Sequence, residues 1–186
     1  MSETPAFPAS NGMRRNTGQS SEKPEFIERV LEINRVARVV KGGKRVRFRA
    51  LVVIGNEKGK VGYGLGKAAD VSGAIAKAVT AAKKNITPIF MQGSTIPYPV
   101  RTHYKSASVL LKPAPAGTGI IAGSSMRVVL ELTGIKDVVG KILGCKNKLS
   151  NTMATIKALN LLMDPQELRD MRKTFSSAAK IKNTKG

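Results

Sequence analysis

The sequence is poor in the residues that form disulfides and base-stacking surfaces. Its 186 residues include one cysteine, Cys145, no tryptophan, three tyrosines and five phenylalanines. A single cysteine excludes an intrachain disulfide, which fits a reducing compartment, and leaves no second thiol for a metal. So few aromatic rings argue against a sequence-specific reader of single strands, since such proteins stack several bases on rings.

Catalytic groups and apolar segments are also scarce. The one histidine, His103, lies in an extended basic stretch with no acid or nucleophile near it in sequence. No spacing typical of a metal site occurs, so we expect no enzyme, no cofactor and no metal. No run of about 18 apolar residues is present, and the N-terminus lacks the pattern of a signal peptide. We expect a protein of the cytoplasm, or of an organelle matrix that translates its own messages, with no membrane partner.

Positive charge dominates what is present. Lys and Arg number 32 against 12 Asp and Glu, which gives a net charge of +20, while 41% of the residues are hydrophobic. The apolar fraction is enough for a folded core. A surface this basic repels itself unless an anion neutralises it, and nucleic acid, an acidic membrane face or an acidic protein are the candidates.

The order of sequence patterns predicts an α+β protein of two small domains. A linker at 91–99, with one Gly and two Pro, separates them. The first domain is expected to be a three-stranded antiparallel sheet plus a helix, and the second an α/β sandwich. The predicted divisions are a flexible arm at 1–24, the two domains at 25–90 and 91–165, and a short helix with a basic tail at 166–186.

Local patterns place the elements within this frame. Residues 25–32 have helical spacing over a short length, and Ser72 is the expected N-cap of a longer helix whose apolar stripe is Val71, Ile75, Val79 and Ala82. Asp164-Pro165 is a typical helix start. Strands are predicted at 33–41, 44–55, 60–67 and 137–143, extended segments at 100–112, and helices at 72–85, 124–132 and 150–164.

The basic strands give the strongest functional signal. Between Arg35 and Lys60 there are nine Lys or Arg and one acid, Glu57. Arg45, Arg47 and Arg49 alternate with apolar residues, so all three lie on one face of a strand. Guanidinium groups match phosphate oxygens in pairs, which favours phosphate binding over a plain solvated face. At the expected hairpin tip, Gly42 and Gly43 allow the backbone to approach a groove closely.

Two glycine-rich segments resemble nucleotide-binding loops. The segment Gly62 to Lys67 fails as a P-loop, because that motif needs Gly and Ser or Thr where Val61 and Ala68 stand. Its glycines instead favour close packing of strand and helix. The segment Gly117 to Ala122 fits the dinucleotide pattern, but the domain is too small for that fold. Either a phosphate-binding nest before a helix or a structural turn explains it.

Three long segments together resemble one family. INRVARVVKGGKRVRFRALVVIGNEKGKVGYGLGKA, AIAKAVTAAKKN and LLKPAPAGTGIIAG closely resemble the fifth protein of the bacterial small ribosomal subunit, and the likeness runs from about residue 25 to about residue 162. The resemblance implies a double-stranded-RNA-binding-like domain followed by an α/β domain. It also implies a structural protein that binds ribosomal RNA near the decoding region, lines the messenger RNA entry path, supports translational accuracy, and touches the fourth and eighth proteins of the subunit.

The expected RNA-binding residues combine the basic pattern with this resemblance, which implies that the hairpin at Lys41 reaches RNA beside the spectinomycin site. They are Asn34, Arg35, Arg38, Lys41, Gly42, Gly43, Lys44, Arg45, Arg47, Arg49, Lys58, Lys60, Lys67, Lys83, Lys84, Thr118 and Lys146.

The chain departs from the family pattern only in its second half. Tyr98 stands where the family commonly has His, and Thr102 and Ser106 stand where Gly is usual. Ser124 and Ser125 follow Gly123 where another Gly is expected, and residues 145–152 lack an Asn-Pro step. Two alternatives stay open: a free-standing binder of double-stranded RNA, and an enzyme that uses the loop at 117–123.

Overall fold

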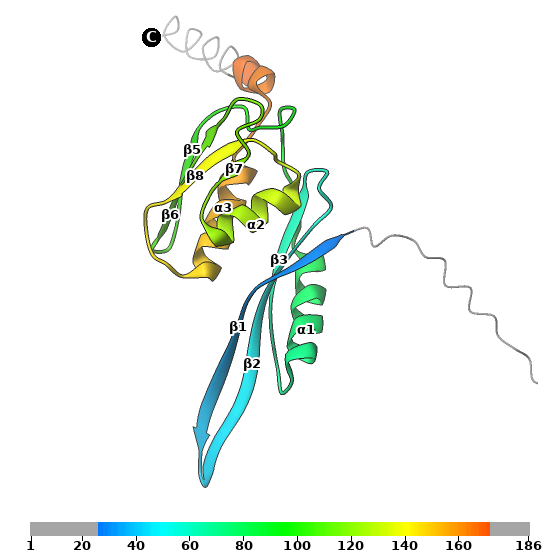
Figure 1. Ribbon diagram of the computed structural model, residues 1–186, viewed down its shortest axis with the longest axis vertical. Helices are drawn as coiled ribbons and strands as arrows, with labels where there is room; N and C mark the ends of the chain where they lie inside the picture. Colours follow the sequence, from blue (N-terminus) through cyan, green and yellow to red (C-terminus); the bar gives the residue numbers. More distant parts are fainter. Residues whose placement is uncertain (1–25, 172–186) are drawn as a thin grey trace, which may run out of the picture.

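A computed structural model describes residues 26–171, so the predicted arm at 1–24 and the tail from residue 174 lie outside the described residues. The first sheet is antiparallel with the order β1-β2-β3-β4, and helix α1 packs on one face of it (Figure 1). The α+β class is confirmed, and a short fourth strand extends the predicted three. The elements are β1 Ile27–Val40, β2 Gly43–Gly55, β3 Lys60–Ala68, α1 Val71–Lys84 and β4 Ile86–Pro88.

The helical spacing at 25–32 does not give a helix, because Ile27 to Glu32 form the first part of β1. Glu28 pairs with Ile54 and Val30 with Val52, and a bulge follows between Val30 and Glu32. A helix of two turns is too short to be stable alone. Pairing with the buried second half of β2 therefore outweighs the weak local spacing.

Helix α1 buries a different face from the predicted stripe. Its N-cap is Asp70, and Ser72 lies inside the helix, so the predicted cap is wrong. The fully buried residues are Ala74, Ala78 and Ala82, while Ile75 and Val79 pack at the edge of the same cluster.

The glycines of β3 explain this choice of face. A Cβ at Gly64 would overlap the carbonyl oxygen of Ala78, and one at Gly66 would overlap that of Ala74. Three alternate glycines thus bring the helix backbone against the strand, where only alanine fits. This confirms the predicted role of these glycines in strand–helix packing.

The second sheet has the order β5-β6-β8-β7, with β7 parallel to β8 and the other pairs antiparallel. Val109, Leu111 and Val138 face the helices and join their core, whereas Arg101 and Lys112 face solvent on the other side. The elements are β5 Val100–Tyr104, β6 Ala107–Pro113, β7 Ile120–Ile121, α2 Ser124–Thr133, β8 Val138–Ile142 and α3 Lys148–Asn160.

Helix α3 begins two residues before the prediction and ends earlier, at Asn160. Asn147 caps it, with Oδ1 accepting from the Leu149 N–H at 3.1 Å. A separate helix over residues 165–171 starts as predicted, where Asp164 Oδ1 accepts from the Gln166 N–H at 2.9 Å. Residues 161–164 therefore lie between the two helices, and α3 is shorter than predicted.

Two of the departures from the family pattern hold α3 in place. The Tyr98 hydroxyl donates to the Leu161 carbonyl and accepts from the Met163 N–H, both at 3.0 Å. Buried Thr102 Oγ1 donates to the Ala154 carbonyl at 3.1 Å. Both contacts therefore depend on the side chains of Tyr98 and Thr102, and a glycine at position 102 could not make the second one.

The two sheets share one apolar core. Val53 and Val61 of the first sheet belong to the same cluster as Leu130 and Leu159 of the second unit. The β2–β3 turn also caps α2, because the Glu57 N–H donates to the Leu132 carbonyl at 3.0 Å. The far ends of β1 and β2 project away from this junction as a long hairpin (Figure 1). The division of the chain at 91–99 stays a prediction.

Candidate nucleic-acid interface

The predicted row of arginines lies on one face of the first sheet. Ala50, Val52 and Ile54 pack against α1, so the alternate residues of β2 point to the opposite face. Arg45 and Arg47 are exposed there, and Arg49 is half-buried. The predicted alternation is therefore present, with apolar groups beneath and guanidinium groups above.

Cross-strand pairing gathers further cations onto this face. Arg38 lies opposite Arg45, and Arg49 lies opposite both Asn34 and Lys67. In the amide orientation that satisfies both of its groups, Asn34 accepts through its oxygen from Arg49 Nη2 at 2.8 Å. We call this set the arginine face; its members are Asn34, Val36, Arg38, Arg45, Arg47, Arg49 and Lys67.

The arginine face is unfavourable for the isolated protein. Like charges directly opposite each other on neighbouring strands are destabilising. No ion pair joins these cations to an acid among residues 26–171. The side chains border a groove of about 350 Å³ lined by Val36, Arg38, Arg45, Arg47 and Lys67 with parts of Ala37 and Val40. The groove is open and bordered by cations, and no acidic side chain among residues 26–171 pairs with them.

The hairpin tip extends this positive surface. Gly42 has a φ of +86°, which L side chains rarely adopt, and a Cβ there would meet nothing within 4 Å. The turn therefore requires glycine for its conformation and not for internal space. Lys41 and Lys44 on either side are exposed.

The glycine loop of the second unit is already occupied by a carboxylate of the same chain. Asp137 Oδ1 accepts from the N–H groups of Gly117 and Gly119, each at 3.0 Å. These bonds, first that from Gly119 and then one from the Ser94 hydroxyl, lower the pKa of Asp137. The structure thus favours the structural turn over the phosphate nest, because a carboxylate of the same chain already accepts from these N–H groups. Sequence reasoning missed Asp137, since nothing local links it to the loop.

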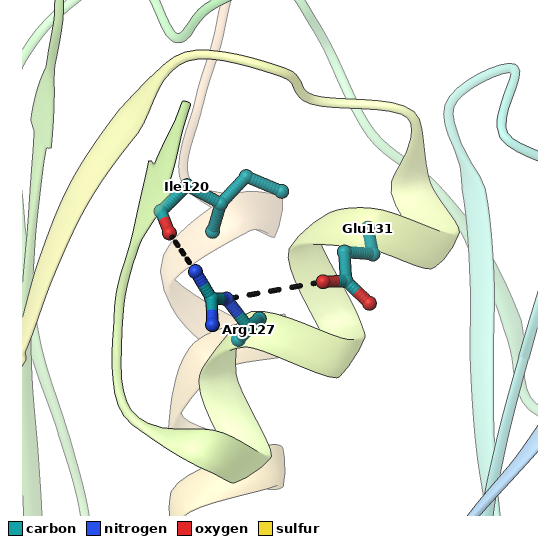
Figure 2. Close-up of polar contacts among 3 residues, drawn as sticks. All are labelled: Ile120, Arg127 and Glu131. Atoms are coloured by element: carbon teal, nitrogen blue, oxygen red, sulfur yellow. Dashed lines mark hydrogen bonds and ion pairs between the residues drawn. The ribbon is translucent and has the colours of Figure 1, made fainter. Parts of the chain in front are cut away.

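Arg127 illustrates a cation that the fold does use internally. Its Nη2 donates to the Ile120 carbonyl at 2.8 Å, and its Nε lies 3.8 Å from Glu131 Oε1 (Figure 2). Figure 2 shows the guanidinium between the two partners, bridging β7 and α2. Charge alone therefore does not mark a ligand site, and the arginine face differs by lacking an acidic partner within residues 26–171.

Comparison with known families decides the assignment. Residues 26–90 match the model described as "Ribosomal protein S5, N-terminal domain", and residues 102–172 match "Ribosomal protein S5, C-terminal domain". The chain belongs to the ribosomal protein S5 family. The recognition made from three sequence segments is confirmed.

Close relatives cover most of the chain. A relative from Protochlamydia amoebophila (strain UWE25) is 47% identical over 148 residues, which are 80% of this chain and 89% of the relative. One from Dehalococcoides mccartyi (strain CBDB1) is 51% identical over 142 residues, 76% of this chain and 83% of the relative. Both are named "Small ribosomal subunit protein uS5".

The other residues that the S5 resemblance predicted lie apart from the arginine face. Arg35 is on the opposite face of β1, since it pairs with Phe48. A second exposed group lies at the far end of the sheet from the hairpin tip, and Lys146 is exposed in the loop before α3. Thr118 Oγ1 donates to the Pro115 carbonyl at 2.8 Å, so its proton is engaged. The second group is Lys58, Lys60, Lys83 and Lys84.

Residues 26–171 contain neither a metal-ligand cluster nor a membrane-spanning helix. Residues 26–171 hold no group of three His, Cys, Asp or Glu placed to bind a metal. None of the helices in the same range is both long and apolar enough to cross a bilayer.

Proposed function

We propose that this chain is a non-catalytic structural component of the small ribosomal subunit that binds ribosomal RNA through the arginine face. The observation that carries the proposal is a groove bordered by cations of three neighbouring strands, with no acid of residues 26–171 paired to them. Membership of the S5 family, together with relatives named for the small ribosomal subunit, supports the assignment to that subunit.

The chemistry of binding follows from the side chains. Each guanidinium donates two parallel hydrogen bonds to phosphate oxygens and keeps its charge at any physiological pH. The arginines thereby relieve the repulsion between RNA backbones that the subunit brings together. Binding of this kind releases counterions and weakens steeply as salt rises.

The arginine face forms the centre of a wider set of proposed contacts. The exposed tip adds Lys41 and Lys44, whose glycine neighbours let the backbone come close to RNA. The remaining residues of the predicted set would meet RNA at the other end of the sheet and at the second unit. The added contacts are Arg35, Gly42, Gly43, Lys58, Lys60, Lys83, Lys84 and Lys146, without Thr118, whose hydroxyl donates to the Pro115 carbonyl.

Finer features of the assignment are proposed from family membership. They are contact with the fourth and eighth proteins of the small subunit, a place beside the messenger RNA entry path near the decoding region, and support of translational accuracy. The protein would act in the cytoplasm, where ribosomes assemble. The net charge of +20 fits a protein surrounded by RNA phosphates.

Sedimentation of a native lysate tests the proposal. We expect the chain to run with the small subunit in a sucrose gradient and to survive a moderate salt wash. The variant Arg45→Gln/Arg47→Gln should be released at lower salt, whereas Arg127→Gln, whose guanidinium is engaged internally, should behave as the parent. A parent chain that stays at the top of the gradient contradicts the ribosomal role and favours a free-standing binder of double-stranded RNA.

A further inference from the structure

The projecting hairpin has a second face, which differs in chemistry from the arginine face. Alternation places Ala37 and Val39 of β1 on this side, opposite Val46 and Lys44 of β2. Arg35 lies one step closer to the body of the protein. We call this set the hairpin underside: Arg35, Ala37, Val39, Lys44 and Val46.

No element among residues 26–171 covers the outer part of this underside. Helix α1 packs mostly on β3 and β2 and begins just after Ala68, which pairs with Phe48. The hairpin continues beyond that level, as Figure 1 shows. Val39 is 74% exposed, whereas Val52 on the same side, under α1, is 0% exposed.

An exposed apolar underside on such a ribbon requires an explanation. A two-stranded ribbon is at best marginally stable in water, and exposed strands usually carry polar side chains for protection. Here two valines and an alanine lie between Arg35 and Lys44, both exposed. The pattern is an apolar stripe with a cationic rim, which fits a partner that offers apolar surface between negative charges.

We propose that the hairpin underside docks on the sugar edge of an RNA helix, in its wide and shallow minor groove. That groove presents ribose rings, with phosphates at its margins. Ribose carbons would lie against Val39, Ala37 and Val46, and the rim cations would meet the phosphates. The hairpin is then held between RNA on both faces. This inference rests on the proposed function, since it places the hairpin in RNA.

Continuity of charge argues for RNA over an acidic protein. Cations run without interruption from Arg45 on the arginine face, around the tip through Lys41, to Lys44 on the underside. No acid separates the two faces between Arg35 and Arg49. A single kind of polyanion can therefore contact the whole hairpin, whereas a protein would meet only part of this surface.

Photocrosslinking in assembled small subunits identifies the occupant. Val39 is replaced by p-benzoylphenylalanine in the full chain, and a second chain carries the same replacement at Arg47. We expect RNA adducts from both positions. RNA adducts from Arg47 alone, with protein, intrachain or no adducts from Val39, would overturn the underside inference and leave the proposed function standing. Absence of RNA adducts from both positions would overturn both.

Binding to purified small-subunit ribosomal RNA gives an independent readout. Val39→Thr keeps a β-branched residue, so the strand is retained. We expect about fivefold weaker binding from the lost apolar contact, with the salt slope unchanged. Val30→Thr, on the same strand near the body of the protein, is the matched control and should bind as the parent. If Val39→Thr binds RNA as tightly as the parent, the underside inference is wrong. The arginine face is tested separately by Arg47→Gln, which should reduce the slope of log affinity against log salt concentration by about 0.7–0.9.

Discussion

The arginine face and the Gly117–Gly119 loop both have sequence patterns typical of phosphate binding, and the structure treats them in opposite ways. On the arginine face, cations of three strands remain without an acidic partner among the described residues. In the loop, two glycine N–H groups already bind Asp137. One region therefore has no acidic partner within residues 26–171, and the other has Asp137.

The difference lies in whether folding removes water from the guanidinium group or from the backbone N–H group. A guanidinium on a long side chain stays hydrated at the surface, so folding leaves it available. A backbone N–H in a packed turn loses water and must be paired, because an unpaired buried donor destabilises the fold. Glycine-rich turns inside a small domain are thus more easily completed by the chain itself than strands of exposed arginine.

Loss of the arginine face gives the largest expected effect. The variant Arg38→Gln/Arg45→Gln/Arg47→Gln should bind small-subunit ribosomal RNA roughly 100-fold more weakly at about 0.1 M salt, with the salt slope reduced by about 2–3. Its Tm should not fall, since the repulsive Arg38–Arg45 pair is removed. Filter binding over a salt series and thermal unfolding measure both. An unchanged slope would contradict phosphate contact by these residues.

Asp137→Asn should have the opposite effects to the arginine variant: Tm should fall by several degrees at pH 7, and RNA affinity should not change. The folded pKa of Asp137 is lowered below the ordinary value of about 3.9, so its stabilisation is present above about pH 4 and is lost as the pH falls through the folded pKa. The parent should therefore lose stability in acid, and the variant should lose less. A variant that binds RNA poorly although folded would mean that the loop also serves the RNA site.

Gly42→Ala and Gly117→Ala form a matched pair across the two regions. Both glycines have positive φ, and a Cβ at either meets nothing within 4 Å, so each substitution should cost about 1–2 kcal/mol from backbone strain alone. Only Gly42→Ala should weaken RNA binding, by about five- to tenfold, because only its turn carries exposed cations. Equal RNA affinities of the two variants would remove the functional distinction between the turns.

Thr118→Val is expected to have the smallest effect. Its hydroxyl donates to the Pro115 carbonyl, so stability should fall by about 0.5–1 kcal/mol. RNA affinity should not change, because the proton is not available to a phosphate. A measurable loss of affinity in the folded variant would restore the RNA contact predicted for Thr118 from the sequence.

Patterns that depend on neighbouring residues were predictable. Alternation of Arg45, Arg47 and Arg49 with apolar residues placed them on one face, and the alternate glycines of β3 indicated close packing on a helix. Both hold in the structure. The hairpin turn at Gly42 was likewise evident, because a positive φ leaves few choices of residue.

Patterns that depend on distant partners could not be predicted from the sequence. Residues 25–32 have weak helical spacing, yet Ile27 to Val30 and Glu32 pair with β2. The apolar stripe of α1 was placed on its larger residues, whereas the strand glycines select Ala74, Ala78 and Ala82. In each case a neighbour on another strand or helix decides the outcome, and local propensity is too weak to oppose it.

The sequence alone determined the sign of the charge, the strand on which it lies and the family of the protein, because each follows from residue type and short-range order. Only the tertiary structure decided that the loop N–H groups belong to Asp137 and that α1 stops short of Val39. Those outcomes depend on which distant groups come together. Side-chain chemistry offers a contact, and packing then determines whether the chain itself or a partner makes it.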